Sequence, residues 1–115
     1  MALNPKKNLK IYYSIKEVAE MFDVSESLLR YWETQFPTLS PKVTSNKVRQ
    51  YTENDIKQVR NIYNLVKVRG FKIASARKMI SKNPTVVDKS TDIIDTLTDV
   101  RDQLKEIRKM LDTIQ

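Results

Sequence analysis

The stretch SESLLRYWE, residues 25–33, decides the fold of this 115-residue chain. Serine is a preferred N-cap residue, so Ser25 predicts the start of a short helix. The apolar residues of that helix can share the side that packs on the rest of the protein: Leu28, Leu29 and Trp32. Most of the polar residues lie on the other side: Ser27, Arg30, Tyr31 and Thr34. We expect Trp32 in the core, because large aromatic side chains mostly serve packing.

The residues before this stretch predict another short helix. Ser14 and Glu17 have the spacing of a capping box, which marks a helix N-terminus. Apolar residues then follow with the period of a helix: Ile15, Val18, Ala19 and Phe22. Only Asp23 and Val24 separate this helix from Ser25. So tight a junction is typical of a helix-turn-helix, whose second helix enters the DNA major groove with its N-terminal residues at the base edges.

The segment PTLSPKVTSNKVRQY, residues 37–51, predicts a small β-hairpin. Its two prolines exclude a regular helix at the start. The residues on either side of Ser45 and Asn46 alternate between polar and apolar, which favours two strands and a turn. Its exposed positions are expected to carry Lys42, Lys47 and Arg49. A basic hairpin directly after a helix-turn-helix indicates a wing on DNA, although a plain hairpin that covers core remains the alternative.

Two more helices are predicted before the C-terminal tail. Thr52 and Asp55 form a second cap signature, and this helix runs to about Val68 with Gly70 as a left-handed C-cap. Its buried positions are expected to be Ile56, Val59, Ile62 or Tyr63, and Val66. A fourth helix extends from Ile73 to Ile80, buries Ile73, Ala76 and Ile80, and stops at Asn83-Pro84.

The tail carries the clearest periodic pattern of the chain. Seven apolar residues alternate by four and three: Ile93, Leu97, Val100, Leu104, Ile107, Leu111 and Ile114. This heptad repeat predicts a coiled coil. The stripe is narrower than that of a globular helix, which favours pairing with a second copy over folding back on the same chain. Leucine at a and isoleucine at d favours more than two strands in parallel coils, and this rule leaves an antiparallel dimer open.

Composition excludes several classes of protein. There is no cysteine and no histidine, so thiolate or imidazole metal sites, disulfides and Cys or His catalysis are excluded. No phosphate-binding glycine motif is present, and we expect neither an enzyme nor a cofactor. No apolar run is long enough to cross a membrane, and the start MALNPKKNLK has no apolar signal segment, so a cytoplasmic protein is expected.

Charge is distributed unevenly along the chain. Residues 1–80 hold 15 Lys and Arg against 7 Asp and Glu, whereas residues 81–115 hold 6 against 7. A polyanion would therefore bind the first part of the chain, although a solvated basic surface explains the same numbers. Arg30 and Tyr31 suit contacts to phosphate oxygens or guanine, and the alternative is that both are ordinary surface residues.

Four segments together resemble the DNA-binding domain of the MerR family of bacterial transcription regulators. They are Tyr13-Ser-Ile-Lys-Glu-Val-Ala19, Val24-Ser-Glu-Ser-Leu-Leu-Arg-Tyr-Trp-Glu33, Arg49-Gln-Tyr-Thr-Glu-Asn-Asp-Ile56 and Arg69-Gly-Phe71. The resemblance covers residues 13–80 and implies a mainly α, winged helix-turn-helix fold with a small hairpin wing. The chain then divides into an N-terminal arm at 1–12, the winged domain at 13–81 and a coiled-coil dimerisation helix at 86–115.

The resemblance also implies a function, that of a sequence-specific transcription regulator. In the family two such domains sit at the ends of an antiparallel coiled coil and bind a pseudo-palindromic operator, often bending promoter DNA for RNA polymerase. By position, the side chains at the major groove are Ser25, Ser27 and Arg30. Those approaching phosphates or the adjacent minor groove are Tyr13, Tyr31, Arg49 and Tyr51.

The sequence departs from the family pattern at two places. Asp23 stands where a turn glycine is common, and aspartate tolerates that backbone better than most residues. The wing has Asn46-Lys47-Val48 where a glycine and an aromatic residue are common. Without cysteine, the metal-sensing and redox-sensing branches of the family are excluded.

Two other functions compete with the regulator. One is an excisionase-like or architectural factor that bends DNA without a transcription role, and the long heptad tail counts against it. The other is a coiled-coil adaptor whose basic domain binds an acidic protein. Steep salt dependence and a defined footprint on DNA separate the DNA readers from the adaptor.

Overall fold

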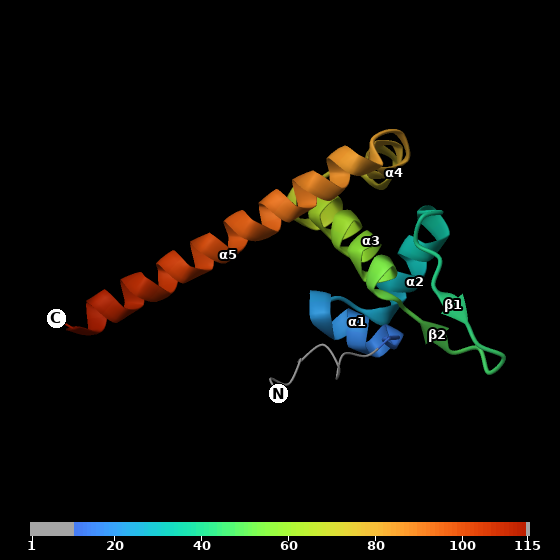
Figure 1. Ribbon diagram of the computed structural model, residues 1–115, viewed down its shortest axis with the longest axis horizontal. Helices are drawn as coiled ribbons and strands as arrows, with labels where there is room; N and C mark the ends of the chain where they lie inside the picture. Colours follow the sequence, from blue (N-terminus) through green and yellow to red (C-terminus); the bar gives the residue numbers. More distant parts are fainter. Residues whose placement is uncertain (1–10, 115) are drawn as a thin grey trace, which may run out of the picture.

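The computed structural model describes residues 11–114, and it is mainly helical with one short hairpin (Figure 1). The elements are α1 (Ile15–Phe22), α2 (Glu26–Gln35), β1 (Lys42–Val43), β2 (Arg49–Gln50), α3 (Glu53–Tyr63), the π-helical segment η2 (Asn64–Val68), α4 (Ile73–Lys82) and α5 (Pro84–Ile114). This order confirms the predicted fold class, a winged helix-turn-helix followed by a long helix. Most of the predicted arm at 1–12 lies outside the described residues.

Helices α1 and α2 begin directly after the predicted N-cap residues, Ser14 and Ser25. The backbone N–H of Ser14 donates to Glu17 at 3.0 Å, and the N–H of Glu17 donates to the Ser14 hydroxyl at 3.1 Å. Asp23 ends α1 in the left-handed conformation with φ 52°. Aspartate therefore fills the tight turn where glycine is common, because its short side chain tolerates this region.

The core lies where α2, α3 and the end of the hairpin meet. Trp32 and Leu29 are fully buried, so the prediction for the packing side of α2 is confirmed, with Leu28 half-buried beside them. On α3 the residues Ile56, Val59 and Ile62 are buried, and Tyr63 is half-buried. The 3.6-residue period thus located most of the core of α3 correctly.

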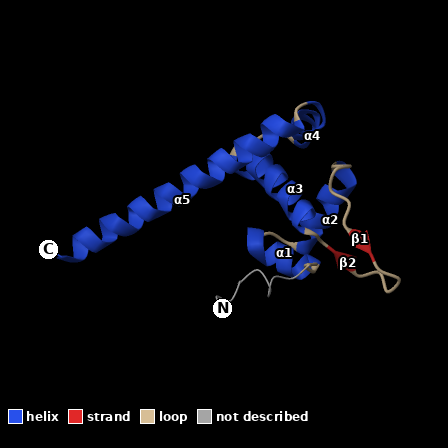
Figure 2. Ribbon diagram, viewed as in Figure 1, coloured by secondary structure: helices blue, strands red, loops and turns tan. Residues whose placement is uncertain are grey.

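The hairpin pairs β1 with β2 antiparallel beside α2 (Figure 2). Val43 lies opposite Arg49, and the predicted turn at Ser45-Asn46 is present. The N–H of Lys47 donates to the Thr44 carbonyl at 2.8 Å, which closes the turn. Lys47 itself has φ 61°, the left-handed conformation that glycine adopts without a steric penalty. Where a wing glycine is common in the family, this hairpin therefore has a lysine with a strained backbone conformation.

Replacing Lys47 with glycine is expected to stabilise the wing by up to about 1 kcal/mol, because the left-handed strain disappears. Lys42→Gly removes the same charge from an extended strand, and it should destabilise the wing instead. Hydrogen exchange of the wing amides measures both effects. A Lys47→Gly wing that exchanges faster than the wild type would contradict the strain.

The end of α3 differs from the sequence prediction. The helix continues to Val68, but its last five residues form a π-helix. Because the turns of a π-helix are wider, the 3.6-residue period fails there. Val66, expected on the buried side, is only half-buried, whereas Leu65 is buried. Gly70 follows with φ 75°, which confirms its predicted left-handed conformation.

Helix α5 begins at Pro84 and joins the domain through a largely polar contact with α3. Val87 and Thr91 are buried against the rest of the protein. Carboxylates at regular intervals on α5 then face polar side chains of α3 and η2. The pairs are Asp88 with Asn61 at 2.6 Å, Asp92 with Lys57, and Asp95 with Asn64 at 3.2 Å and Arg60 at 3.4 Å. Beyond these contacts α5 projects away from the other helices (Figure 1).

Within residues 11–114 no helix has both the length and the apolar character needed to cross a membrane.

Candidate nucleic-acid interface

The outer side of α2 presents the polar residues that the sequence assigned to base edges. Ser27 and Arg30 are exposed, and the Arg30 Nη2 donates to the Ser27 hydroxyl at 3.3 Å. Arg30 also lies 3.8 Å from a carboxylate oxygen of Glu26. Exposed pairs of this kind contribute only about 0.3–0.5 kcal/mol. The guanidinium can therefore exchange these contacts for a nucleic acid at little cost.

Ser25 has a structural task in the same helix. Its hydroxyl accepts the N–H of Leu28 at 3.1 Å and so caps the N-terminus of α2. A capping hydroxyl still has lone-pair and donor capacity for a second partner. Tyr31 lies on the outer side as well and is 48% exposed. The structure thus places Ser25, Ser27, Arg30 and Tyr31 at the surface of one helix.

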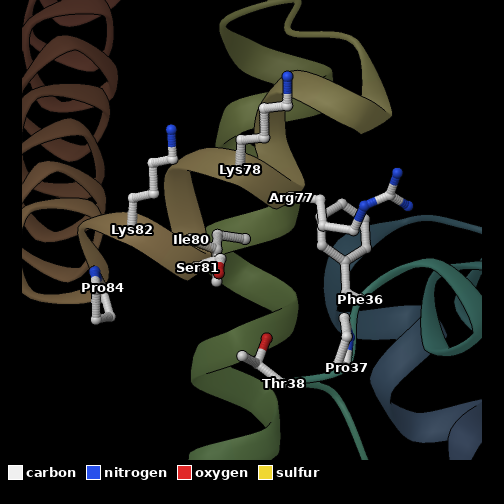
Figure 3. A pocket seen from close by; sticks show the side chains of 9 residues that line it. All are labelled: Phe36, Pro37, Thr38, Arg77, Lys78, Ile80, Ser81, Lys82 and Pro84. Atoms are coloured by element: carbon white, nitrogen blue, oxygen red, sulfur yellow. The ribbon is translucent and has the colours of Figure 1, made fainter.

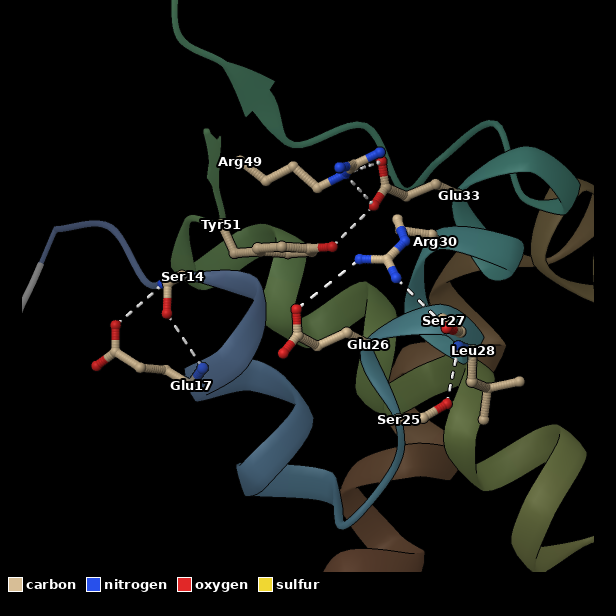
Figure 4. A network of polar contacts seen from close by, with 10 residues as sticks. All are labelled: Ser14, Glu17, Ser25, Glu26, Ser27, Leu28, Arg30, Glu33, Arg49 and Tyr51. Atoms are coloured by element: carbon tan, nitrogen blue, oxygen red, sulfur yellow. Dashed lines mark hydrogen bonds and ion pairs between the residues drawn. The ribbon is translucent and has the colours of Figure 1, made fainter. Parts of the chain in front are cut away.

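Glu33 connects α2 to the hairpin (Figure 4). The Nε of Arg49 donates to both of its carboxylate oxygens, at 3.1 and 2.9 Å. The Tyr51 hydroxyl donates to the same carboxylate at 2.8 Å. Arg49 and Tyr51 are two residues apart, so an extended chain directs both side chains to the same face. One carboxylate therefore fixes the orientation of the wing relative to α2.

Tyr51 lies in the core rather than on the surface that a contact with DNA requires. It is fully buried, although the sequence assigned it to phosphates or the minor groove. Burial raises the pKa of the Tyr51 phenol, and the hydrogen bond to Glu33 raises it further. The phenol consequently stays protonated and remains a hydrogen-bond donor to Glu33. In this conformation Tyr51 holds the wing in place and has no surface to offer a nucleic acid.

Arg49 and Tyr13 occupy positions between core and surface. Arg49 is half-buried, and the Nε that it gives to Glu33 is one of five N–H donors in a guanidinium. Tyr13 forms an isolated β-bridge with Tyr51, with both backbone hydrogen bonds at 2.8 Å. The Tyr13 hydroxyl donates to Glu53 at 3.1 Å. Both residues therefore contribute to the packing of the wing.

The two predicted wing lysines are exposed. Lys42 lies on β1, and Lys47 lies at the end of the turn. Among the residues assigned to DNA, the exposed side chains therefore come from α2, its N-cap and the hairpin, and Glu33 links α2 to the hairpin. Among the described residues there is no group of acidic side chains that could hold a metal ion.

The importance of Glu33 was not recognised from the sequence. The signal was present, because Arg49 and Tyr51 have the spacing of side chains on one strand face and both can donate hydrogen bonds. A carboxylate was the missing partner, and Glu33 lies half-buried one position after Trp32. Sequence alone does not show which carboxylate comes within reach.

Replacing Glu33 with glutamine is expected to lower the free energy of unfolding by about 1.5–3 kcal/mol, the range for a hydrogen bond to a charged group. The amide offers one oxygen to the two donors, Arg49 and Tyr51. Thermal melts of Glu33→Gln, Tyr51→Phe and the double variant form a cycle that isolates the coupling. If the stability losses of the two single variants simply add in the double variant, Glu33 and Tyr51 are not in contact in solution.

Comparison with known proteins identifies the family. The family model described as MerR HTH family regulatory protein matches residues 13–83. No curated protein matches the chain. Among solved structures, the chain resembles HiNmlR, a MerR family regulator lacking the sensor domain and bound to promoter DNA, with 17% identity and a TM-score of 0.51 over 90% of this chain and 84% of that one. It also resembles a MerR family transcriptional regulator from Bacillus cereus, with 22% identity and a TM-score of 0.55 over 88% of this chain and 78% of that one.

At these identities the structural likeness establishes the fold, and the family model establishes the family. The match extends from Tyr13 to Asn83 and so includes α1, α2, the hairpin, α3 and α4. It covers more than half of the sequence and includes every residue assigned to nucleic acid. The chain therefore belongs to the MerR family of helix-turn-helix regulatory proteins.

Proposed function

We propose that this protein binds a pseudo-palindromic operator as a homodimer and regulates transcription from the promoter that contains it. The observation that carries the proposal is the exposed heptad stripe of α5. We call its seven residues the seam: Ile93, Leu97, Val100, Leu104, Ile107, Leu111 and Ile114. Their exposed fractions range from 45% to 79%. A row of apolar side chains this long is seldom left in water on a soluble monomer.

A second copy of α5 is the partner that fits the seam. The N-terminal part of α5 packs on α3 and α4 through a different face, and the seam starts at Ile93, near the end of that contact, and continues beyond it. None of the residues 11–114 folds back to cover the seam. Side chains at heptad positions a and d pack into holes between the side chains of a facing helix with the same pattern. We further propose an antiparallel pair, which carries one DNA-binding domain at each end, as in the family that the sequence resembles.

The proposed contacts with DNA follow from exposure. Ser27 and Arg30 read bases in the major groove, with Ser25 at the helix N-terminus beside them. The other exposed donors contact phosphates: Tyr31, Lys42 and Lys47. Arg49 contacts a phosphate with the N–H donors that Glu33 does not use. Tyr13, which pairs with Tyr51 through a β-bridge, contacts the DNA backbone beside the wing.

Two-fold symmetry of the dimer supports an inverted repeat in the operator, because each domain reads one half-site. Contact with RNA polymerase at a promoter belongs to the same proposal, and its support is membership of the MerR family of regulators. The competing function is an architectural factor that bends DNA without a transcription role. Transcription from a template with the bound site, measured with and without the protein, distinguishes the two.

In vitro selection of bound duplexes from a random pool tests the operator. We expect a recovered inverted repeat whose two halves are read alike. Recovery of a single half-site would contradict the dimer, and recovery of no consensus would contradict sequence-specific binding. The two contradicting outcomes can be told apart, because the selected sequences show both the length of the bound site and whether it has a consensus.

Arg30 and Lys42 are expected to contribute differently to DNA binding. Arg30→Ala should cost about 1–3 kcal/mol on the selected site and relax the preference at one base, if the guanidinium holds a guanine. Lys42→Ala should weaken selected and random DNA equally and lower the salt slope by about one. Titrations at several salt concentrations measure both variants. Equal effects on the ratio of specific to random affinity would refute the assignment.

A further inference from the structure

A cavity of about 550 Å³ lies beside the C-terminal end of α2, and none of the residues assigned to DNA lines it (Figure 3). The loop after α2 forms one wall with Phe36, Pro37 and Thr38. Helix α4 forms the other wall, and Pro84 at the start of α5 completes the lining. The volume lies within the range of about 300–1,000 Å³ that small-molecule sites occupy.

The walls of the cavity are mostly apolar, and its charged groups all have one sign. Pro37, Pro84 and the methyl group of Thr38 supply exposed carbon surface, whereas Phe36 and Ile80 are buried. Three cationic side chains line the same space: Arg77, Lys78 and Lys82. No acidic side chain is among the described residues of the lining, and no described carboxylate pairs with either lysine. The lysines are four residues apart, so one side of α4 presents both ammonium groups (Figure 3).

We propose that this cavity binds an amphipathic organic anion, with an aromatic or alkyl body and one carboxylate, sulfonate or phosphate group. The body packs on Pro37 and Pro84, and the alkyl stems of Lys78 and Lys82 add further carbon surface. The anionic group lies between Lys78 and Lys82, where it offsets the repulsion between two like charges. A DNA backbone fits the charge but not the walls, because a phosphodiester chain gains little from an apolar hollow.

Arg77 connects the cavity to α2. Its Nη1 donates to the backbone carbonyl of Gln35 at 3.3 Å and to the Gln35 side-chain oxygen at 3.2 Å, and so satisfies the C-terminus of α2. An anion in the cavity competes for this guanidinium and alters the end of α2. This coupling to DNA rests on the proposed function, whereas binding of the anion is independent of it.

Two fluorescent probes with the same rings test the site on the full chain without DNA. One is 8-anilinonaphthalene-1-sulfonate, and the other is the neutral N-phenyl-1-naphthylamine. We expect the sulfonate to saturate at one probe per chain and to bind at least tenfold more tightly than the neutral probe. The double variant Lys78→Gln/Lys82→Gln should remove that tenfold advantage and leave the neutral probe unchanged. Equal binding of the two probes to the wild type would overturn the proposal.

A pair of matched serine variants locates the bound probe. Ser81 lines the cavity, whereas Ser75 lies on the same helix outside it, and both are exposed. Ser81→Trp should weaken both probes at least tenfold, and Ser75→Trp should weaken neither. Thermal melts check the fold, and Ser81→Leu replaces the larger residue if Ser81→Trp does not melt cooperatively. Unchanged binding to a folded Ser81 variant would place the probe elsewhere, for example on the seam, and overturn the proposal.

Competition with random duplex DNA gives the last outcome. If duplex DNA displaces the sulfonate probe, and the lysine variant loses the same factor in DNA affinity as in probe affinity, the lysines serve the phosphate backbone and the proposal fails. Retained DNA affinity in the lysine variant, with the probe lost, supports a separate anion site.

Discussion

Trp32→Ala is expected to lower the free energy of unfolding by roughly 3–5 kcal/mol, the range for removing a large buried aromatic residue. Trp32 is fully buried in the cluster that α2 forms with α3 and the end of the hairpin. No neighbouring side chain can fill so large a space without moving the helices. DNA affinity measured per folded molecule should stay close to that of the wild type, because Trp32 presents no surface to a ligand.

The neighbouring residue provides the matched control. Tyr31 is 48% exposed, and on a helix it points about 100° away from Trp32. Tyr31→Phe should leave the melting temperature almost unchanged and cost about 0.5–1.5 kcal/mol of DNA affinity, the net contribution of one hydrogen bond. Thermal melts at one protein concentration and DNA titrations at one salt concentration measure this crossed outcome. A Trp32→Ala variant that melts like the wild type would show that the core is packed differently.

Leu104→Asp is expected to separate the proposed dimer into monomers. Leu104 is the middle residue of the seam and is 61% exposed in the single chain. A second α5 would bury this position, and an unpaired carboxylate there costs several kcal/mol. The dimer should therefore dissociate at least a hundredfold more readily, which corresponds to about 2.7 kcal/mol. Because the position is exposed in the monomer, the helical content of the domain should survive.

Lys105→Asp is the control for that experiment, since it adds the same carboxylate to the next, off-seam position of α5. Sedimentation equilibrium at micromolar concentration should find wild type and Lys105→Asp as dimers and Leu104→Asp as a monomer. Operator affinity should fall with the dimer, whereas affinity for a single half-site should not. A wild type that sediments as a monomer would contradict the homodimer directly.

Local signals in the sequence were sufficient to predict where the first three helices begin and where the hairpin turns. Ser14, Ser25 and Thr52 each cap a helix as their residue type predicts, because a cap depends only on residues within one turn. Asp23 and Gly70 both take the left-handed conformation expected of them. These features need no knowledge of the rest of the chain.

Contacts between distant segments could not be predicted in the same way. Glu33 meets Arg49 and Tyr51 only after the hairpin has packed on α2, and sequence does not give that distance. Asn61 and Asn64 are polar and were not expected in the interior, yet both are buried against carboxylates of α5. Hydrophobic periodicity cannot identify such positions, since it counts every polar side chain as exposed.

Under the proposed antiparallel pairing, the projecting part of α5 sets the distance between the two DNA-binding domains. From Ile93 to Ile114 the helix extends roughly 33 Å, at about 1.5 Å per residue. If two copies pair antiparallel along the seam, this length separates the two DNA-binding domains. It is close to one turn of B-DNA, which is about 34–36 Å. Adding one heptad to α5 would increase the distance between the two DNA-binding domains by about 10 Å. This corresponds to about three base pairs at 3.4 Å each. Under the proposed antiparallel pairing, the number of heptads in α5 would therefore set the spacing of the operator half-sites.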